Sequence, residues 1–277
     1  MDLIFLEKSL YQKYTSIMEQ FIIQETDQNI LILKINRAPH NFIKLAVLEQ
    51  LGKAIADAEK NHSYEGLILT SAIDNIFISG HEIIDLCEED NNRKLTKNLR
   101  FIAEILLSIQ RLHIPTLTII NGNCVGFGLE LALCTDFRFI YDADINVGFP
   151  EVKLGTFPPF GGIYRLVKLI GETRARELLM KGKLLKPQAA LEWGVVDVIS
   201  NKEDSMSDAI KLLKGMSRHA PLALTAIKRS LVDATLKDFI TVIQDDIEDY
   251  TTIVRSYDYA EGKKALEDGR TPVFKNG

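Results

Sequence analysis

The stretch Asn121–Phe139, NGNCVGFGLELALCTDFRF, combines a short strand, a glycine-rich junction and an apolar run with helical spacing. Gly126 and Gly128 give the backbone freedom on either side of Phe127. One interpretation is a tight entry into a core helix, with Glu130 favouring the helix dipole. The other is that the backbone approaches a ligand, with the Phe127 N–H and Glu130 aimed at it. A glycine motif alone does not decide between the two.

A second junction of the same kind occurs earlier in the chain, in NIFISGHEIIDL from Asn75. An apolar strand leads through Gly80 and His81 into a predicted helix, whose first N–H groups lack intrahelical acceptors. Alone, this pattern is usually an ordinary turn. Two such junctions in one chain could together supply a pair of backbone donors to a developing oxyanion.

A third stretch, NVGFPEVKLGTFPPFGG from Asn146, places irregular backbone around a single acid, Glu151. This is typical of a loop that lines a pocket, although loops without catalytic roles look similar. Glu130 and Glu151 lie 21 residues apart, which is enough for a helix and a returning strand. The two carboxyl groups could therefore converge, and a close pair cannot easily ionise together, so that one tends to keep its proton.

The rest of the chain predicts alternating strands and helices. FIIQETDQNILILKI from Phe21 predicts a hairpin, and further strands are expected in GLILTSA, PTLTIIN and DFRFIYDA. Helices are expected over residues 7–20, 43–60, 98–112 and 129–134 from their apolar periodicity. After about Asp204 only helical patterns remain. The sequence therefore predicts an α/β body with crossover connections and a helical C-terminal region.

Composition excludes several classes of protein. The 277 residues include 46% hydrophobic and 26% charged residues, as expected for a globular protein. A net charge of −5 gives no overall basic footprint for nucleic acid. The apolar runs are shorter than the roughly 20 residues that a membrane span needs. Three scattered cysteines and five histidines form no metal-binding pattern. We therefore expect a cytoplasmic protein that binds no metal, no nucleic acid and no membrane.

Six segments in order resemble the crotonase superfamily, also called the enoyl-CoA hydratase/isomerase family. They are NRAPHN, FISGHEI, NGNCVGFGLELALCTDFRF, FPEVKLGTFPPFGG, KLLKPQAALEWGVVD and EGKKALEDGRTPVFKNG, between residues 36 and 277. The resemblance implies a spiral of β-β-α units with a helical C-terminal region. It implies an N-terminal extension over residues 1–20, an α/β core over 21–203 and a trimerisation region over 204–277, and a homotrimer or homohexamer.

The resemblance also implies a site for an acyl-CoA thioester, with no cofactor other than the coenzyme A of the substrate. The backbone N–H groups of His81 and Phe127 would bind the thioester oxygen. Glu130 and Glu151 match the two glutamates that bind and activate water in the hydratases. Substrate-binding positions by motif are Gly80, Gly126 and, for the CoA phosphates, Lys275.

Both glutamates favour an enoyl-CoA hydratase, which adds water reversibly to a trans-2-enoyl-CoA. An enoyl-CoA isomerase needs only one acid/base, which Glu151 could supply, and decarboxylases and hydrolases share the same scaffold. A non-enzymatic protein that binds RNA or acyl-CoA is the remaining alternative. The Gly-Phe-Gly junction departs from the family's run of small residues, so that the Phe127 ring bears on the shape of the acyl pocket.

Overall fold

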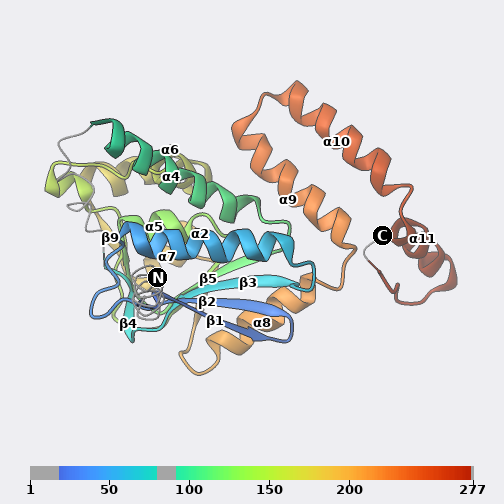
Figure 1. The fold of residues 1–277 in the computed structure, drawn as a ribbon, viewed down its shortest axis with the longest axis horizontal. Helices are drawn as coiled ribbons and strands as arrows, with labels where there is room; N and C mark the ends of the chain where they lie inside the picture. The colour runs from blue at the N-terminus through green and yellow to red at the C-terminus, as the bar shows by residue number, and fades with distance from the viewer. Residues whose placement is uncertain (1–18, 80–91, 276–277) are drawn as a thin grey trace, which may run out of the picture.

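The computed structural model describes residues 19–79 and 92–275. The helix predicted over residues 7–20 lies almost wholly outside these ranges, and so do Gly80, His81 and the helix expected after them. Within the described ranges the protein has the mixed α/β fold with a helical C-terminal region that the sequence predicts (Figure 1).

The larger of two sheets has six strands in the order β1-β2-β3-β5-β7-β10. The strands are β1 (Ile22–Asp27), β2 (Ile30–Ile35), β3 (Gly66–Ser71), β5 (Thr116–Ile120), β7 (Phe137–Tyr141) and β10 (Val198–Ser200). β1 and β2 form the predicted hairpin, and Gln28 and Asn29 have the positive φ values that a two-residue hairpin turn requires. The other neighbours pair in parallel, so that crossover connections join them.

The smaller sheet has the order β4-β6-β8-β9. Its strands are β4 (Asn75–Ile78), β6 (Gly122–Val125), β8 (Val147–Gly148) and β9 (Leu184–Leu185). Each pair β3/β4, β5/β6 and β7/β8 places its first strand in the large sheet and its second in the small one. Repeating this step along the chain generates the spiral of β-β-α units. Gly122 permits the close pairing of β6 with β4, because a Cβ there would lie 1.9 Å from the Asn75 carbonyl carbon.

Helices cover both faces of the large sheet. On one face lie α2 (Leu45–Lys60), α4 (Asn92–Arg111), α5 (Phe127–Ala132) and α6 (Gly162–Lys181), whose apolar sides join one core cluster. Figure 1 shows α8 (Ser205–Met216) on the opposite side of this sheet. There Ile210 and Leu213 pack with Ile68 and Phe139 in a second cluster. α7 (Pro187–Trp193) precedes β10.

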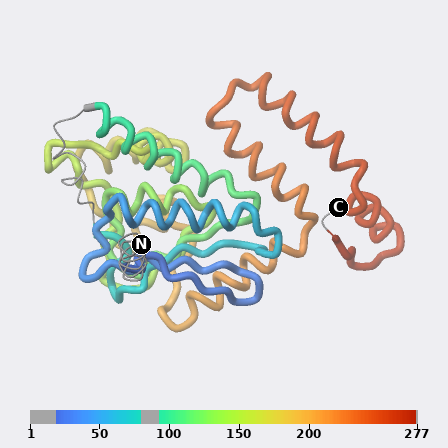
Figure 2. Tube along the Cα trace, in the orientation of Figure 1, coloured from blue at the N-terminus to red at the C-terminus, as the bar shows by residue number. Residues whose placement is uncertain are grey.

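The last three helices are α9 (Pro221–Leu236), α10 (Phe239–Ile253) and α11 (Tyr257–Asp268). α10 and α11 stand away from the two sheets (Figure 2). α9 is tied to the body by Lys228, whose ammonium group donates to Asp136 at 2.7 Å and to the Ile114 carbonyl at 2.8 Å. Of the predicted C-terminal region over residues 204–277, α8 packs on the large sheet, whereas α10 and α11 do not. The predicted division of the chain at residues 20 and 203 stays a prediction. None of the helices described is long and apolar enough to cross a membrane.

Two helices differ at their starts from the sequence-based expectation. α5 begins at Phe127 rather than at residue 129, because Gly126 at φ +60° turns the chain directly into the helix. α4 begins at Asn92, before the apolar periodicity that predicted it from residue 98. The earlier start of α5 is important for the site, since it makes Phe127 the first residue of the helix.

Candidate active site

At the start of α5, the positions of Gly126 and Gly128 have no room for a side chain. A Cβ at Gly128 would lie 2.9 Å from both the Cβ and the carbonyl oxygen of Ile78, the last residue of β4. A Cβ at Gly126 would lie 3.0 Å from Glu151 Oε1. The two glycines flanking Phe127 therefore bring the helix start against β4 on one side and against a carboxylate on the other.

Glu130 is completely buried in the first turn of α5. Its Oε1 accepts hydrogen bonds from the backbone N–H groups of Phe160 at 2.8 Å and Gly162 at 2.9 Å. The other oxygen, Oε2, has no partner in the part of the chain that the structure describes. The carboxylate is thus held through one oxygen while the other is available to a ligand.

The pKa of Glu130 is raised to about 7, chiefly because burial disfavours the charged form. The two backbone N–H groups oppose that shift, and the nearby charge of Glu151 adds to it. A carboxyl group with a pKa near neutrality can gain or lose a proton at physiological pH, as acid/base catalysis requires.

Glu151 begins the short 3-10 helix η1 (Glu151–Leu154), directly after Pro150. It is 3% exposed, and neither carboxylate oxygen has a hydrogen-bond partner among the described residues. Burial raises the pKa of this carboxyl as well. η1 ends at Gly155 in the left-handed region, where the backbone turns and the Thr156 N–H returns to the Glu151 carbonyl at 3.1 Å. The backbone of Glu151 is therefore fixed, while its carboxylate is free to bind.

The structure brings together three elements that the sequence predicted to share a site. Glu151 lies against Gly126, and its charge acts on Glu130 one turn further along α5. Two buried carboxyl groups close to each other resist simultaneous ionisation. The arrangement therefore provides one protonated and one ionised carboxyl group in the same place.

The predicted backbone donors are only partly described. Phe127 is the first residue of α5, so its N–H has no intrahelical acceptor and is available to an external oxygen. Gly80 and His81 lie outside the described residues. Ile78, two positions before Gly80, lies against Gly128, so that the preceding strand ends beside the start of α5.

The Phe127 side chain lies in the core and is 1% exposed. Its ring meets the ring of Phe160 edge to face, with the centroids 5.7 Å apart. Phe160 is also the residue whose N–H holds Glu130. The Phe127 ring therefore packs against the Phe160–Gly162 turn, whose N–H groups donate to Glu130.

Lys275 does not lie with the two glutamates within one chain. Its ammonium group sits 5.0 Å from the ring centroid of Tyr257, and its backbone N–H donates to Asp258 at 2.6 Å. Both contacts are with the start of α11, which Figure 1 shows on the opposite side of the molecule from α5.

Other candidate chemistries receive no support from the described residues. Cys124 and Cys134 are buried free thiols, and burial raises the pKa of both, that of Cys134 to about 11. Neither thiol is therefore a reactive thiolate at neutral pH. No group of histidine, cysteine and acidic side chains within residues 19–79 and 92–275 has a metal-binding arrangement.

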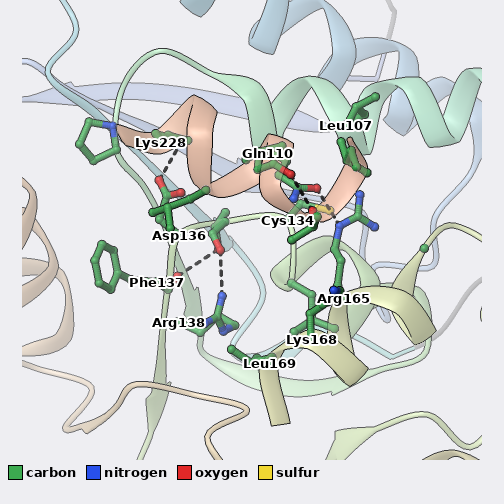
Figure 3. A pocket seen from close by; sticks show the side chains of 18 of the residues that line it. Leu107, Gln110, Cys134, Asp136, Phe137, Arg138, Arg165, Lys168, Leu169 and Lys228 are labelled. Carbon is green, nitrogen blue, oxygen red and sulfur yellow. Dashed lines mark hydrogen bonds and ion pairs between the residues drawn. The ribbon is translucent and has the colours of Figure 1, made fainter. Parts of the chain in front are cut away.

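Sequence reasoning missed the turn Phe160–Gly162 and the residues behind it. The glycines of this turn were visible in the sequence, but nothing marked Phe160 and Gly162 as donors to a residue 30 positions away. Arg165 and Gln110 gave no signal, because polar residues on amphipathic helices usually face solvent. Both line a cavity of about 720 Å³ between the body and α9, on which Figure 3 is centred. Neither Glu130 nor Glu151 lines this cavity.

Comparison with known proteins gives consistent matches. The family model described as enoyl-CoA hydratase/isomerase matches residues 25–277. The chain is 28% identical to 2,3-dehydroadipyl-CoA hydratase of Escherichia coli K12, over 92% of this chain and 98% of that protein. It is 31% identical to an enoyl-CoA isomerase/hydratase of Zymoseptoria tritici, over 89% and 83% of the two chains. A solved structure of an enoyl-CoA hydratase from Bacillus anthracis superposes with a TM-score of 0.85 at 26% identity, covering 93% of this chain and all of that one.

Proposed function

Because the chain belongs to the enoyl-CoA hydratase/isomerase family of acyl-CoA enzymes, we propose that it adds water reversibly to a trans-2-enoyl-CoA, giving a 3-hydroxyacyl-CoA. The observation that carries this proposal is the buried pair of Glu130 and Glu151, with three carboxylate oxygens that have no hydrogen-bond partner in the described chain. A water molecule held between these two groups could donate both of its protons to carboxylate oxygens, which would activate its oxygen for attack on a carbon atom.

In the proposed reaction Glu130, in its ionised form, polarises the water through Oε2 and takes up a proton as the oxygen bonds to C3 of the substrate. The electron pair of the C2–C3 double bond passes onto the thioester oxygen, giving an enolate. Glu151, in its protonated form, then donates a proton to C2, and the carbonyl re-forms. One proton leaves the water and one reaches C2, so that the net change is the addition of water. Transfer of a proton from Glu130 to Glu151, directly or through solvent, then restores the starting protonation states of the two carboxyl groups.

The enolate requires donors at the thioester oxygen, and we assign these to the backbone N–H groups of Phe127 and His81. Fixed donors stabilise the charge where it develops, and loss of one such donor raises the barrier by roughly 3 kcal/mol. Coenzyme A is part of the substrate in this proposal, and no further cofactor takes part.

The isomerase alternative is supported by the Zymoseptoria tritici relative, whose name combines both activities. Moving a double bond from C3 to C2 needs one acid/base, and Glu151 would suffice for it. Glu130 would then serve mainly to hold the turn at Phe160. The two reactions therefore make different demands on Glu130.

We also propose that the protein is a cytoplasmic trimer or hexamer. Large apolar side chains are exposed along α9 and α10, where a partner subunit would cover them: Ile227, Leu231, Leu236, Phe239, Ile240, Ile243 and Ile247. Since Lys275 lies away from the glutamates of its own chain, its predicted role in binding CoA phosphates would be exercised at a neighbouring subunit. Sedimentation equilibrium of the purified protein tests this assembly, and a monomer would contradict it.

The test of the reaction is the loss of enoyl-thioester ultraviolet absorbance with crotonyl-CoA and longer trans-2-enoyl-CoAs. We expect Glu130→Gln and Glu151→Gln each to lower kcat by roughly 10²–10⁴-fold, as removal of a general acid or base typically does. Glu172→Gln is the matched control, because Glu172 is an exposed glutamate paired with Arg176 on α6.

The outcomes separate the candidate functions. Absence of hydration in a protein that binds acyl-CoA would overturn the hydratase proposal. Conversion of 3-enoyl-CoA that survives Glu130→Gln but not Glu151→Gln would identify an isomerase. Retention on RNA that weakens with salt, without turnover of any acyl-CoA, would favour the binding protein.

A further inference from the structure

The Phe160–Gly162 turn holds Glu130 through two backbone N–H groups, and Arg165 holds this turn. The guanidinium group of Arg165, on the first turn of α6, donates through Nη1 to the Phe160 carbonyl at 2.8 Å. Its Nε donates to Gln110 Oε1 on α4 at 3.0 Å, a contact that lies in the view of Figure 3. The Arg165 head is therefore fixed between the turn and a neighbouring helix.

The two adjacent glycines of the turn face in two directions. A Cβ at Gly161 would lie 2.6 Å from Arg165 Nη1, so this glycine makes room for the guanidinium group. A Cβ at Gly162 would lie 2.6 Å from Glu130 Cγ, so that glycine makes room for the glutamate. The turn is a single backbone layer with the arginine on one side and the glutamate on the other.

The peptide groups of this layer are shared between the two side chains. Phe160 donates its N–H to Glu130 and accepts the Arg165 proton with its carbonyl oxygen. A hydrogen bond to a charged donor is stronger and shorter than one between neutral groups. Loss of the arginine would leave the turn, and with it both Glu130 donors, without its fixed point.

We infer that Arg165 is a positioning residue for Glu130: its guanidinium group, oriented by Gln110, fixes the Phe160–Gly162 turn so that two N–H groups point at Glu130 Oε1. The described hydrogen bonds of the Arg165 side chain go to Gln110 and to the Phe160 carbonyl rather than to Glu130, so its positioning effect is exerted through the backbone. The kinetic consequence rests on the proposed hydratase function, whereas the structural one does not.

Arg165 also acts on Glu130 electrostatically. Three described groups have charges or protons near Glu130: Glu151 on η1, Arg165 on α6, and the Cys134 thiol just beyond the end of α5, which donates to the Glu130 carbonyl. Burial and Glu151 raise the pKa of Glu130, and Arg165 lowers it. Removing the arginine should therefore move the Glu130 titration to higher pH.

The experiment compares Arg165→Met with Lys168→Met. Lys168 lies one turn further along α6 and lines the same cavity, with its ammonium group near the Tyr164 ring. Both changes remove one positive charge from the same helix. We expect Arg165→Met to lower kcat for enoyl-CoA hydration by roughly 10–100-fold, as loss of an outer-layer contact or a misplacement of about 1 Å does. Lys168→Met should stay within about twofold of the parent protein.

Two milder variants keep the inference testable if Arg165→Met unfolds. Arg165→Lys retains the charge but not the two-pronged contact, and should lower kcat with little change in the pH profile. Gln110→Leu leaves the arginine in place without its second anchor, and should give a smaller loss of kcat than Arg165→Met.

A second readout is independent of turnover. The infrared band of the protonated Glu130 carboxyl, identified by its absence in Glu130→Gln, is titrated in each variant. We expect its midpoint in Arg165→Met to lie at higher pH than in the parent protein, and that of Lys168→Met to stay unchanged. An unchanged midpoint together with a kcat within twofold of the parent would overturn the positioning role. A shifted midpoint in a protein without hydratase activity would instead overturn the proposed function alone.

Discussion

The two buried glutamates have opposite surroundings. Glu130 accepts two backbone hydrogen bonds from a turn that Arg165 supports, whereas the Glu151 carboxylate has no hydrogen-bond partner among the described residues. One carboxylate is positioned by its contacts and the other by the backbone of a short helix. The difference separates two requirements of a two-carboxylate site: one group must be aimed, and one must be free to exchange a proton.

Burial of the ionised carboxylate opposes folding at both glutamates. At Glu130 two backbone donors offset part of that cost, whereas the Glu151 carboxylate has no such donor among the described residues. Glu151 is therefore a group that the fold tolerates for a reason other than stability. Groups of this kind are frequent at functional sites.

The largest expected effect concerns the stability of the protein as a function of pH. The pKa of Glu130 rises from its unfolded value of 4.5 to about 7 in the folded state. Below pH 4.5 this carboxyl is protonated in both states, and its contribution is constant. As the pH rises to about 7 the unfolded state loses its proton first, so that about 3 kcal/mol of unfolding free energy is lost.

Glu130→Gln cannot ionise and should lack this dependence. Urea unfolding of both proteins between about pH 5 and pH 8 gives the difference directly, because the contributions of other groups largely cancel. Parallel curves for the two proteins would mean that Glu130 titrates normally and is not buried as the structure has it.

The next effect is produced by one methyl group on the turn. In Gly162→Ala the new Cβ would overlap Glu130 Cγ and lie 2.9 Å from Oε1. The carboxylate must then move, and a displacement of about 1 Å lowers kcat roughly 100-fold. The control is Gly215→Ala on α8, where nothing lies within 4 Å of the added carbon and activity should be unchanged. Equal kcat values for the two variants would show that Glu130 needs no exact placement.

The pH dependence of catalysis compares the two glutamates directly. If ionised Glu130 polarises the water, kcat/KM for hydration should fall tenfold for each pH unit below about 7. In Glu130→Gln the residual activity should lose this acid limb. Rates measured with crotonyl-CoA over a pH series would test this, and an acid limb that persists in the variant would assign the titration to another group.

Local pattern predicted the alternating strands and helices and showed that Glu130 and Glu151 could converge. The resemblance to the family predicted the spiral of β-β-α units and the roles of the two glutamates. A window of about 20 residues is enough to recognise the hairpin at Gln28 and Asn29, the alternating strands and the glycine junction before Glu130. The hydrogen bonds from the Phe160 and Gly162 N–H groups to Glu130 cannot be recognised in this way, because the donors lie 30 and 32 positions from the acceptor. A backbone donor has no side-chain identity that a sequence could display.

Arg165 was invisible for a related reason. Its partners are a backbone carbonyl and the neutral side chain of Gln110 rather than an acid, so no opposite charge in the sequence points to it. Only the three-dimensional structure shows that the arginine and Glu130 lie on opposite sides of the same turn. Residues that support the reacting groups from behind, as Arg165 does here, are the part of a site that motif analysis detects least well.

The smallest expected effect is a gain in stability at Glu151. Replacing a buried, unpartnered carboxylate by a neutral amide in Glu151→Gln removes the cost of burying its charge, and should raise the unfolding free energy at pH 8 by about 1 kcal/mol. Glu172→Gln, which breaks only an exposed ion pair, should change it by less than about 0.5 kcal/mol. A variant that loses hydration while gaining stability would mark Glu151 as a residue retained for chemistry. If Glu151→Gln were instead destabilised, the carboxylate would have a stabilising partner, and the contrast with Glu130 would be wrong.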